Sequence, residues 1–188
     1  MLRARPPLIA VAILAALVLV ACGSDDPAGP GQTPDYGSLD DAPPKLADLY
    51  AKGDALLAGG PATLRTTLEN LEGHPVVVNK WASWCGPCRA EAPFFQSQVA
   101  KRGDEIAFLG VNSNDSREGA EGFLADYPVP YPSIEDPKLE VAKRIDAILT
   151  FPSTVFYDAS GKRTFVHQGQ YRSEADLEAE ITKHATGG

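Results

Sequence analysis

Two cysteines separated by two residues are the part of this sequence best suited to do chemistry. Cys85 and Cys88 lie in the stretch WASWCGPCRAEAPFF, residues 81–95, directly after an apolar run. Such a pair can clamp a metal, reduce a peroxide, or exchange with the disulfides of other proteins. A third cysteine, Cys22, lies far upstream and needs its own explanation.

The N-terminal residues have the pattern of an export signal. Arg3 and Arg5 precede an unbroken apolar run over residues 8–20, which is shorter than the roughly 20 residues needed to span a bilayer. This length suits the apolar region of a secretory signal peptide. The run ends in Leu-Val-Ala-Cys22, which resembles the lipobox of bacterial lipoproteins. We therefore expect a signal peptide over residues 1–21 and lipidation of Cys22; an ordinary signal peptide or an uncleaved anchor is the alternative.

Assigning Cys22 to a lipid leaves the CxxC pair as the only other cysteines. That count excludes a framework of structural disulfides, although an exported protein meets an oxidising compartment. Residues 22–44 are rich in Gly, Pro, Ser and Asp, and we expect them to form a flexible tether. The net charge of −8 argues against binding nucleic acid, because phosphate contacts require clustered Lys and Arg.

The CxxC pair is expected to lie between a strand and a helix. Residues 75–81 are β-branched, bounded by breakers, and predict a buried strand. Residues 85–102 predict a helix that Pro93 should kink. A strand that leads straight into CxxC places Cys85 at the helix N-terminus, where free N–H groups favour an anion. We expect this placement to lower the pKa of Cys85 and to make its thiolate the nucleophile, with Cys88 as the resolving thiol.

The rest of the folded part, residues 45–188, predicts further strands and helices around this unit. Apolar spacing predicts a β-hairpin near the C-terminus and a final helix that Ser173 opens. The order predicts an α/β fold with a mixed central sheet and helices on both faces. The expected helices cover residues 46–57, 61–71, 116–126 and 137–149, and the expected strands cover residues 106–111, 153–157 and 163–167.

Residues 62–185 resemble the thioredoxin superfamily, and within it the TlpA/ResA-like membrane-anchored thiol-disulfide oxidoreductases. The resemblance rests on WASWCGPCRAEAP as a whole and not on the bare CxxC. It implies a thioredoxin-like fold in which the block of residues 112–144 is the insertion typical of TlpA-like proteins. It also implies that Cys85 attacks a partner disulfide and that Cys88 resolves the mixed disulfide.

The same resemblance assigns the residues around the dithiol. Pro152 matches the cis-proline that faces the dithiol, and a plain proline at a strand start is the alternative. Glu91 matches an acid that shifts thiol pKa values or relays a proton, and a solvated surface glutamate is the alternative. The residues expected to support catalysis or line the substrate groove are Trp84, Gly86, Pro87, Glu91, Phe151 and Pro152.

Three positions depart from the family pattern. Asn79 occupies the place of the buried aspartate of thioredoxin, which argues against an acid relay from this site because asparagine cannot take a proton. Lys80 is charged where the family usually has an aromatic residue, so it should snorkel to the surface or pair with an acid. Phe151 is bulkier than usual before the proline and is expected to narrow the substrate groove.

Other functions for the cysteine pair fit less well. A resemblance to peroxiredoxins would require Thr/Ser-x-x-Cys, with a hydroxyl residue three positions before the cysteine. Ala82 occupies that position here. A resemblance to Sco-like copper chaperones would require CxxxC and a distant histidine. His167 is the only candidate for that histidine, and the spacing here is CxxC. A structural zinc site needs four ligands, and a second CxxC is absent. We therefore expect no metal site and no cofactor beyond the dithiol.

The sequence thus predicts a lipid-anchored, extracytoplasmic thiol-disulfide oxidoreductase of a bacterial membrane or periplasm. The resemblance implies a disulfide reductase that acts on exported proteins, such as the apocytochrome of cytochrome c biogenesis, and that takes electrons from an unidentified membrane donor. Gly86-Pro87 is the dipeptide of reducing thioredoxins and favours this direction. A disulfide-forming oxidase of the same fold is the main alternative, because the potential depends on the whole thiolate environment.

Overall fold

A computed structural model describes residues 31–188. The predicted signal peptide and the lipidation site at Cys22 lie outside the described residues. The strands are β1 (Leu56–Leu57), β2 (Val76–Trp81), β3 (Ala107–Ser113), β4 (Ser133–Asp136), β5 (Ser153–Tyr157) and β6 (Arg163–Gln168). The helices are the 3-10 helix η1 (Gly37–Asp41), α1 (Pro44–Tyr50), α2 (Gly60–Asn70), α3 (Gly86–Arg102), α4 (Arg117–Asp126), α5 (Glu140–Arg144) and α6 (Glu174–His184).

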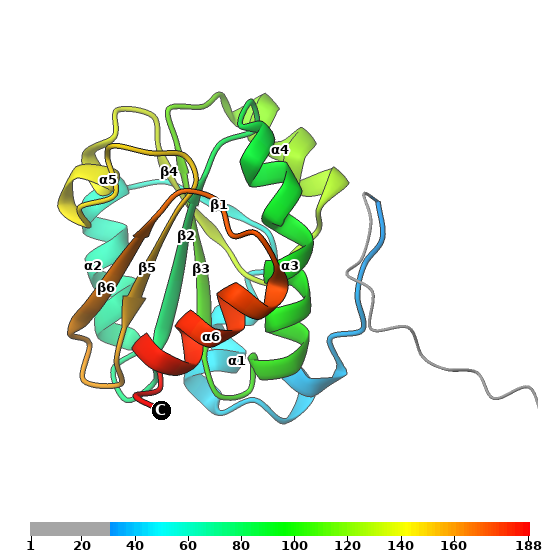
Figure 1. Cartoon of the computed structure of the whole chain (residues 1–188), viewed down its shortest axis with the longest axis vertical. Helices are drawn as coiled ribbons and strands as arrows, with labels where there is room; N and C mark the ends of the chain where they lie inside the picture. Colours follow the sequence, from blue (N-terminus) through cyan, green and yellow to red (C-terminus); the bar gives the residue numbers. More distant parts are fainter. Residues whose placement is uncertain (1–30) are drawn as a thin grey trace, which may run out of the picture.

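The strands form one mixed sheet in the order β1-β4-β3-β2-β5-β6. β2 pairs in parallel with β3 and antiparallel with β5, and β6 is antiparallel to β5. Helices α3 and α6 lie together on one face of the sheet, and α2 and α5 lie together on the other (Figure 1). The predicted mixed sheet with helices on both faces is confirmed.

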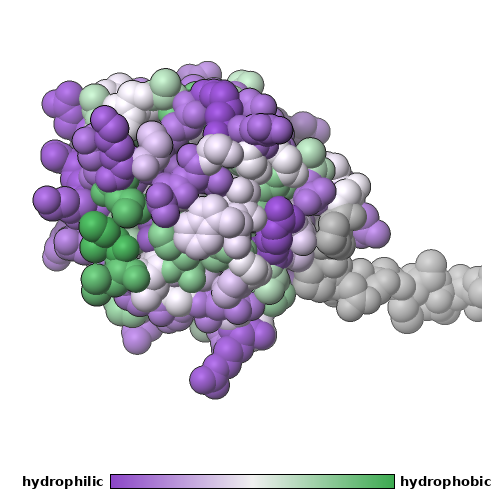
Figure 2. Space-filling view, turned by 90° about the horizontal axis from the view of Figure 1, so that it is seen from above, coloured by the Kyte–Doolittle hydropathy of each residue, from purple (hydrophilic) through white to green (hydrophobic). Residues whose placement is uncertain are grey.

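The parallel strands β1 to β4 end together at the upper end of the molecule in Figure 1. The loops that leave these strand ends lead into α3, α4 and α5. Figure 2 looks down on this end and shows a surface that is mostly hydrophilic, with one strongly hydrophobic patch at its left. Because loops at the carboxyl ends of parallel strands commonly carry ligand sites in α/β proteins, this end is where a functional site is expected.

Strand β2 shows why the sequence around the cysteines folds in this way. All six of its residues are buried, and helices cover both of its faces, which explains its continuous β-branched run. After a short loop, α3 begins with Cys85 as its N-cap and Pro87 in its first turn, where proline is well tolerated. The helix continues past Pro93 to Arg102.

The leucines near residue 56 were predicted to continue the first helix, and this prediction was wrong. α1 ends at Tyr50, and Gly53 follows in a left-handed turn with φ of +56°. Leu56 and Leu57 then form β1, which pairs in parallel with β4 at the edge of the sheet. Their spacing from the preceding leucines fits one helix face, but a glycine in a left-handed turn separates the two segments.

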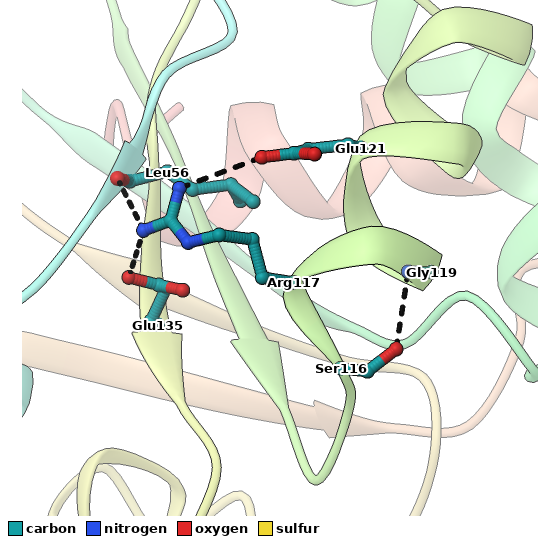
Figure 3. A network of polar contacts seen from close by, with 6 residues as sticks. All are labelled: Leu56, Ser116, Arg117, Gly119, Glu121 and Glu135. Carbon is teal, nitrogen blue, oxygen red and sulfur yellow. Dashed lines mark hydrogen bonds and ion pairs between the residues drawn. The ribbon is translucent and has the colours of Figure 1, made fainter.

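Arg117 connects this edge strand to α4 (Figure 3). Its guanidinium donates to the Leu56 carbonyl at 3.5 Å, forms an ion pair with Glu135 of β4, and lies 3.6 Å from Glu121 one helical turn later. Ser116 caps the same helix by accepting from the Gly119 N–H at 3.1 Å, as its sequence position predicts. These contacts bring α4 and the sheet edge together at the upper end.

The segment between α4 and β5 also differs from its prediction. Residues 137–149 were expected to be helical, but α5 covers only Glu140–Arg144. Leu139 and Asp146 both have a left-handed backbone, with φ of +60° and +58°, so the helix cannot extend through either residue. β4 was not predicted, because a four-residue strand containing Ser133, Glu135 and Asp136 lacks an apolar pattern. The block expected to be an insertion therefore contributes a strand to the sheet.

The packed region begins before residue 45. Tyr36 Oη donates to the Pro128 carbonyl at 3.1 Å, and Ser38 Oγ donates to the Ala100 carbonyl at 2.7 Å. Leu39 packs against the hydrophobic core. The tether predicted over residues 22–44 therefore ends earlier than expected. Tyr36 and Leu39 pack against the core, although the segment as a whole is rich in Gly and Pro. Between residues 31 and 188, the helices are all too short or too polar to cross a bilayer.

Candidate active site

Cys85 and Cys88 are joined by a disulfide at the N-terminus of α3. The Cys88 N–H donates to Cys85 Sγ at 3.1 Å, so the helix terminus supplies a hydrogen-bond donor to this sulfur. Cys85 is 3% exposed and Cys88 is 1% exposed, which means that both sulfurs are covered in the disulfide form. Gly86 and Pro87 form the first turn between them. This geometry favours a thiolate at Cys85 once the disulfide is reduced.

Two aromatic residues lie beside the disulfide. Trp84 is 56% exposed, and its Nε1–H donates to the Asn114 carbonyl at 2.8 Å. Its ring lies 4.8 Å from the ring of Phe151, which packs against the cluster of buried residues that contains both cysteines. The peptide bond between Phe151 and Pro152 is cis. The structure thus brings together residues 84–88 and residues 151–152, which are far apart in the sequence.

Asp115 fixes the loop that carries Trp84, and the sequence analysis missed it. Its carboxylate accepts from the Ser83 N–H and from Ser83 Oγ at 2.7 Å, and it also accepts from Asn112 Nδ2 at 2.8 Å. Burial raises the pKa of Asp115, but the hydrogen bonds from Ser83, Asn112 and Ser116 outweigh burial and lower that pKa. The only sequence signal was an acid placed just before the Ser116 N-cap, which does not indicate a contact 32 residues away.

Glu91 lies on α3, one turn after Cys88, and its side chain is fully buried. Its Oε2 accepts from the Tyr171 N–H at 3.2 Å, whereas Oε1 has no hydrogen-bond partner among the described residues. Burial raises the pKa of Glu91 to about 8, partly offset by the Tyr171 hydrogen bond. The alternative of a solvated glutamate is therefore wrong. Asn79 is also buried, and its Oδ1 likewise has no partner within residues 31–188.

Lys80 is the second buried ionisable residue near the disulfide. It is 0% exposed, its Nζ donates to the Ala147 carbonyl at 2.6 Å, and it lies 3.5 Å from the centroid of the Phe151 ring. Burial lowers the pKa of Lys80 to about 8, although the charge of Asp136 acts in the opposite direction. The expectation that Lys80 reaches the surface or pairs with an acid was wrong. The ammonium instead donates to a backbone carbonyl and lies against an aromatic face, because the Lys80 side chain points from β2 into the protein interior.

His167, the candidate ligand for copper, lies on the opposite side of β5 from β2. Its Nδ1 lies 3.1 Å from a Glu180 carboxylate oxygen, and its ring stacks on Tyr171 with centroids 4.2 Å apart. In the described part of the chain, no three His, Cys, Asp or Glu side chains converge as metal ligands would. The contacts of His167 are therefore those of a residue that joins β6 to α6.

Comparisons with known proteins identify the family and the relatives of this chain. A family model described as Redoxin matches residues 50–181. The chain is 31% identical over 103 residues to the thiol-disulfide oxidoreductase ResA of Oceanobacillus iheyensis, covering 54% of this chain and 53% of that protein. It is 32% identical over 98 residues to the soluble secreted antigen MPT53 of Mycobacterium tuberculosis, covering 52% of this chain and 56% of that protein. The chain thus spans little more than half the length of these curated relatives.

The fold has a counterpart among solved structures. The exposed lipoprotein thioredoxin Etrx1 of Streptococcus pneumoniae aligns with a TM-score of 0.53 at 23% identity, covering 62% of this chain and 89% of that one. At this identity the match shows the fold alone. The thioredoxin-like fold predicted from WASWCGPCRAEAP is confirmed.

Proposed function

The chain belongs to the redoxin family, and from that premise we propose that it is a thiol-disulfide oxidoreductase that exchanges electrons with exported proteins through Cys85 and Cys88. The observation that carries the proposal is the Cys85–Cys88 disulfide at the N-terminus of α3, with Trp84 and Phe151 beside it. The name of the relative ResA, a thiol-disulfide oxidoreductase, supports the same chemistry.

In the proposed reaction, the Cys85 thiolate of the reduced protein attacks one sulfur of a substrate disulfide. The substrate S–S bond breaks, a mixed disulfide forms, and the other substrate sulfur leaves as a thiolate that takes up a proton. The Cys88 thiolate then attacks Cys85 Sγ and displaces the second substrate thiolate, which is also protonated. The substrate gains two electrons and two protons, and the protein is left with the Cys85–Cys88 disulfide. An external dithiol reductant must then reduce that disulfide again.

Glu91 is proposed to handle the proton of Cys88. The two residues are one helical turn apart, so their side chains are neighbours on α3. With a pKa of about 8, the carboxyl group changes charge close to the pH at which a thiol of ordinary acidity does. The carboxylate form of Glu91 can accept the Cys88 proton when this thiol attacks the mixed disulfide.

We propose that the protein works outside the cytoplasm as a reductase. The export signal, lipidation at Cys22 and the tether are predictions from the sequence, and the relative MPT53 is described as secreted. The Gly86-Pro87 dipeptide favours reduction, with apocytochrome c as a candidate substrate and a membrane dithiol as the electron donor. Lipidation is tested by metabolic labelling with a radioactive fatty acid, which should label the wild type and leave Cys22→Ser unlabelled.

A trapping experiment tests the exchange chemistry. Reduced Cys88→Ser protein, mixed with a peptide dimer joined by one disulfide, should accumulate a mixed disulfide at Cys85 that mass spectrometry detects. Cys85→Ser serves as the matched control and should give no such adduct. An adduct formed equally well by Cys85→Ser would exclude Cys85 as the nucleophile.

The direction of electron flow is tested by the equilibrium potential of the dithiol against glutathione. A potential below about −200 mV supports the reductase, whereas one near −120 mV, as in strong disulfide donors, supports the oxidase instead. Peroxide consumption without a disulfide substrate would favour a peroxiredoxin.

A further inference from the structure

The loop before Pro152, residues 145–151, carries exposed apolar side chains shortly before Phe151, which packs against the cluster of buried residues that contains both cysteines. Ile148 is 42% exposed and Leu149 is 85% exposed, both unusual values for large aliphatic residues. The hydrophobic patch at the left of Figure 2 lies on the side where Figure 1 places α5 and this loop. Exposed aliphatic groups beside a reactive site commonly mark a surface that meets a partner.

Lys80 contacts this loop from its buried side. The Lys80 ammonium donates to the carbonyl of Ala147, which is itself buried, and it lies against the face of the Phe151 ring. Lys80 therefore contacts residues on both sides of Ile148 and Leu149 in the sequence, Ala147 before them and Phe151 after them. On the outside, Gln168 Nε2 donates to the Asp146 carbonyl at 3.0 Å, which fastens the start of the loop to β6.

The contact with Phe151 continues to the rim of the site. The Phe151 ring lies 4.8 Å from the ring of Trp84, which is bonded to the Asn114 carbonyl. One chain of contacts thus runs from the buried ammonium through Phe151 to Trp84 beside Cys85. These contacts connect Lys80 to the surface around the disulfide, although Lys80 is itself fully buried and out of reach of any substrate.

We propose that Lys80 is a positioning residue that holds Phe151 and the Ile148–Leu149 loop in place, so that this surface docks the apolar polypeptide segment beside the disulfide of a substrate protein. The proposal rests on the proposed thiol-disulfide exchange. The occupant is a polypeptide because the same loop carries Phe151, which lies beside Trp84 and packs against the cluster that contains both cysteines. It is apolar because Ile148, Leu149 and Trp84 expose mainly apolar atoms. In this proposal, a substrate bonded to Cys85 extends past Trp84 and Phe151 onto Ile148 and Leu149.

The contacts of Lys80 are not those of an ordinary structural salt bridge. Within residues 31–188, no carboxylate lies at ion-pair distance from its Nζ. The charged group that acts on it is Asp136, whose oxygens already accept from the Val141 and Ala142 N–H groups and from Ser113 Oγ. Burial of a cation without a carboxylate is unfavourable, and the lowered pKa of Lys80 reflects this. A methionine would fill a similar space without a buried charge but would leave the Ala147 carbonyl without its donor, so the role that the structure shows for the ammonium is its contact with the loop.

Steady-state reduction of two peptide dimers by the full chain tests the proposal. Each dimer is joined by one disulfide, and its cysteine is flanked by leucines in one peptide and by serines in the other. Lys80→Met should raise KM for the leucine peptide about tenfold, the size expected for a lost charge-assisted contact, with kcat changed less than about twofold. For the serine peptide KM should change little. Lys143→Met, the same chemical change on the exposed side of α5, is the matched control.

A double-mutant cycle with Phe151→Leu tests the route of the effect. If Lys80 acts through the Phe151 ring, Lys80→Met should raise KM for the leucine peptide clearly less in the Phe151→Leu background than in the wild type. Fully additive effects would overturn this route. Far-ultraviolet circular dichroism and thermal unfolding establish that each variant folds, and Phe151→Leu alone should raise KM for the leucine peptide if Lys80→Met does not fold.

The outcomes separate the two proposals. If the wild type reduces neither peptide, the proposed function fails and the role of Lys80 fails with it. If the wild type is active but Lys80→Met has an unchanged KM for the leucine peptide, only the positioning role is overturned. An equal rise in KM for both peptides would also overturn it, because a general distortion of the site would not distinguish the flanking residues.

Discussion

Two buried ionisable side chains flank the dithiol, one on each face of the sheet, and they differ in how the protein surrounds them. Glu91 lies with α3 and α6, receives one backbone hydrogen bond, and has an oxygen without a partner in the described chain. Lys80 lies on the α5 side, where its ammonium has a carbonyl at 2.6 Å and an aromatic face at 3.5 Å.

Burial moves both pKa values to about 8, the acid upward and the base downward. At neutral pH the consequence is opposite, because Glu91 is then mainly uncharged and Lys80 mainly charged. A poorly satisfied acid is suited to exchanging a proton, whereas a well-satisfied cation is suited to holding other groups in place. Two groups with the same pKa therefore need not have the same role, because the role of each group depends on the residues that it contacts.

The largest expected effect concerns stability on the Glu91 side. In the unfolded chain this carboxyl titrates near 4.5, so between pH 4.5 and 8 the folded state binds more protons and the free energy of unfolding falls as pH rises. Glu91→Gln removes this titration. The oxidised variant should be about 3 kcal/mol more stable than the wild type at pH 9, and the difference should shrink towards pH 4.

Urea unfolding at several pH values measures this difference. Glu178→Gln, on the exposed side of α6, makes the same chemical change at the surface and should leave the pH dependence as it is in the wild type. A Glu91→Gln protein whose stability runs parallel to that of the wild type from pH 4 to 9 would show that Glu91 is not the buried acid described here.

The second effect is catalytic and separates the roles of the two side chains. Glu91→Gln should lower kcat for disulfide peptides about tenfold, because a general base for Cys88 is lost, with KM unchanged within about twofold. The wild-type rate should rise as pH approaches 8, and the variant should lack this rise. Stopped-flow kinetics of mixed-disulfide resolution measure the step directly. A change in KM alone would assign Glu91 to docking and would remove the contrast with Lys80.

The third effect is a stability change with the opposite pH dependence. The pKa of Lys80 in the folded state lies below its unfolded value of 10.5, so the unfolded state binds more protons between pH 8 and 10.5 and wild-type stability rises across that window. Lys80→Met relieves the buried charge but leaves the Ala147 carbonyl without its donor. These two changes largely offset each other. We expect a net gain of about 1 kcal/mol at pH 7 that turns into a net loss of about 2 kcal/mol by pH 11, because wild-type stability rises by about 3 kcal/mol across that window whereas methionine does not titrate; urea unfolding measures the change, with Lys143→Met as control.

The sequence predicted the centre of the molecule better than its edges. Strand β2, helix α3 and the hairpin of β5 and β6 have strong apolar patterns or clear caps, and all were placed correctly. β1 and β4 were missed because each is short, lies towards one edge of the sheet and depends on pairing with a distant segment. Residues such as Gly53 and Asp146 end the regular structure through their left-handed backbone, which sequence spacing does not reveal.

The candidate site divides in the same way. Cys85, Cys88 and Pro152 could be assigned from a motif, whereas the surroundings of Glu91 and Lys80 depend on which segments cover them. Neighbouring residues of a strand such as Asn79 and Lys80 lie on opposite faces of the sheet, but this alternation does not show that Phe151 and the Ala147 carbonyl cover the ammonium. Asp115 contributes through contacts with Ser83, and no local pattern connects these two residues.

The smallest expected effect is the coupling between Glu91 and Lys80, and it tests whether the two sides of the sheet act independently. The charge of neither residue contributes to the pKa shift of the other, and the hydrogen-bond and ring contacts of the two residues involve different groups. The stability changes of Glu91→Gln and Lys80→Met should therefore add in the double variant to within about 0.5 kcal/mol at pH 7. The kinetic effects should also combine: the double variant should have the kcat of Glu91→Gln and the KM of Lys80→Met. A coupling above about 1 kcal/mol would show that one polar network crosses the sheet beneath the dithiol, and proton transfer and docking could then no longer be assigned to separate faces.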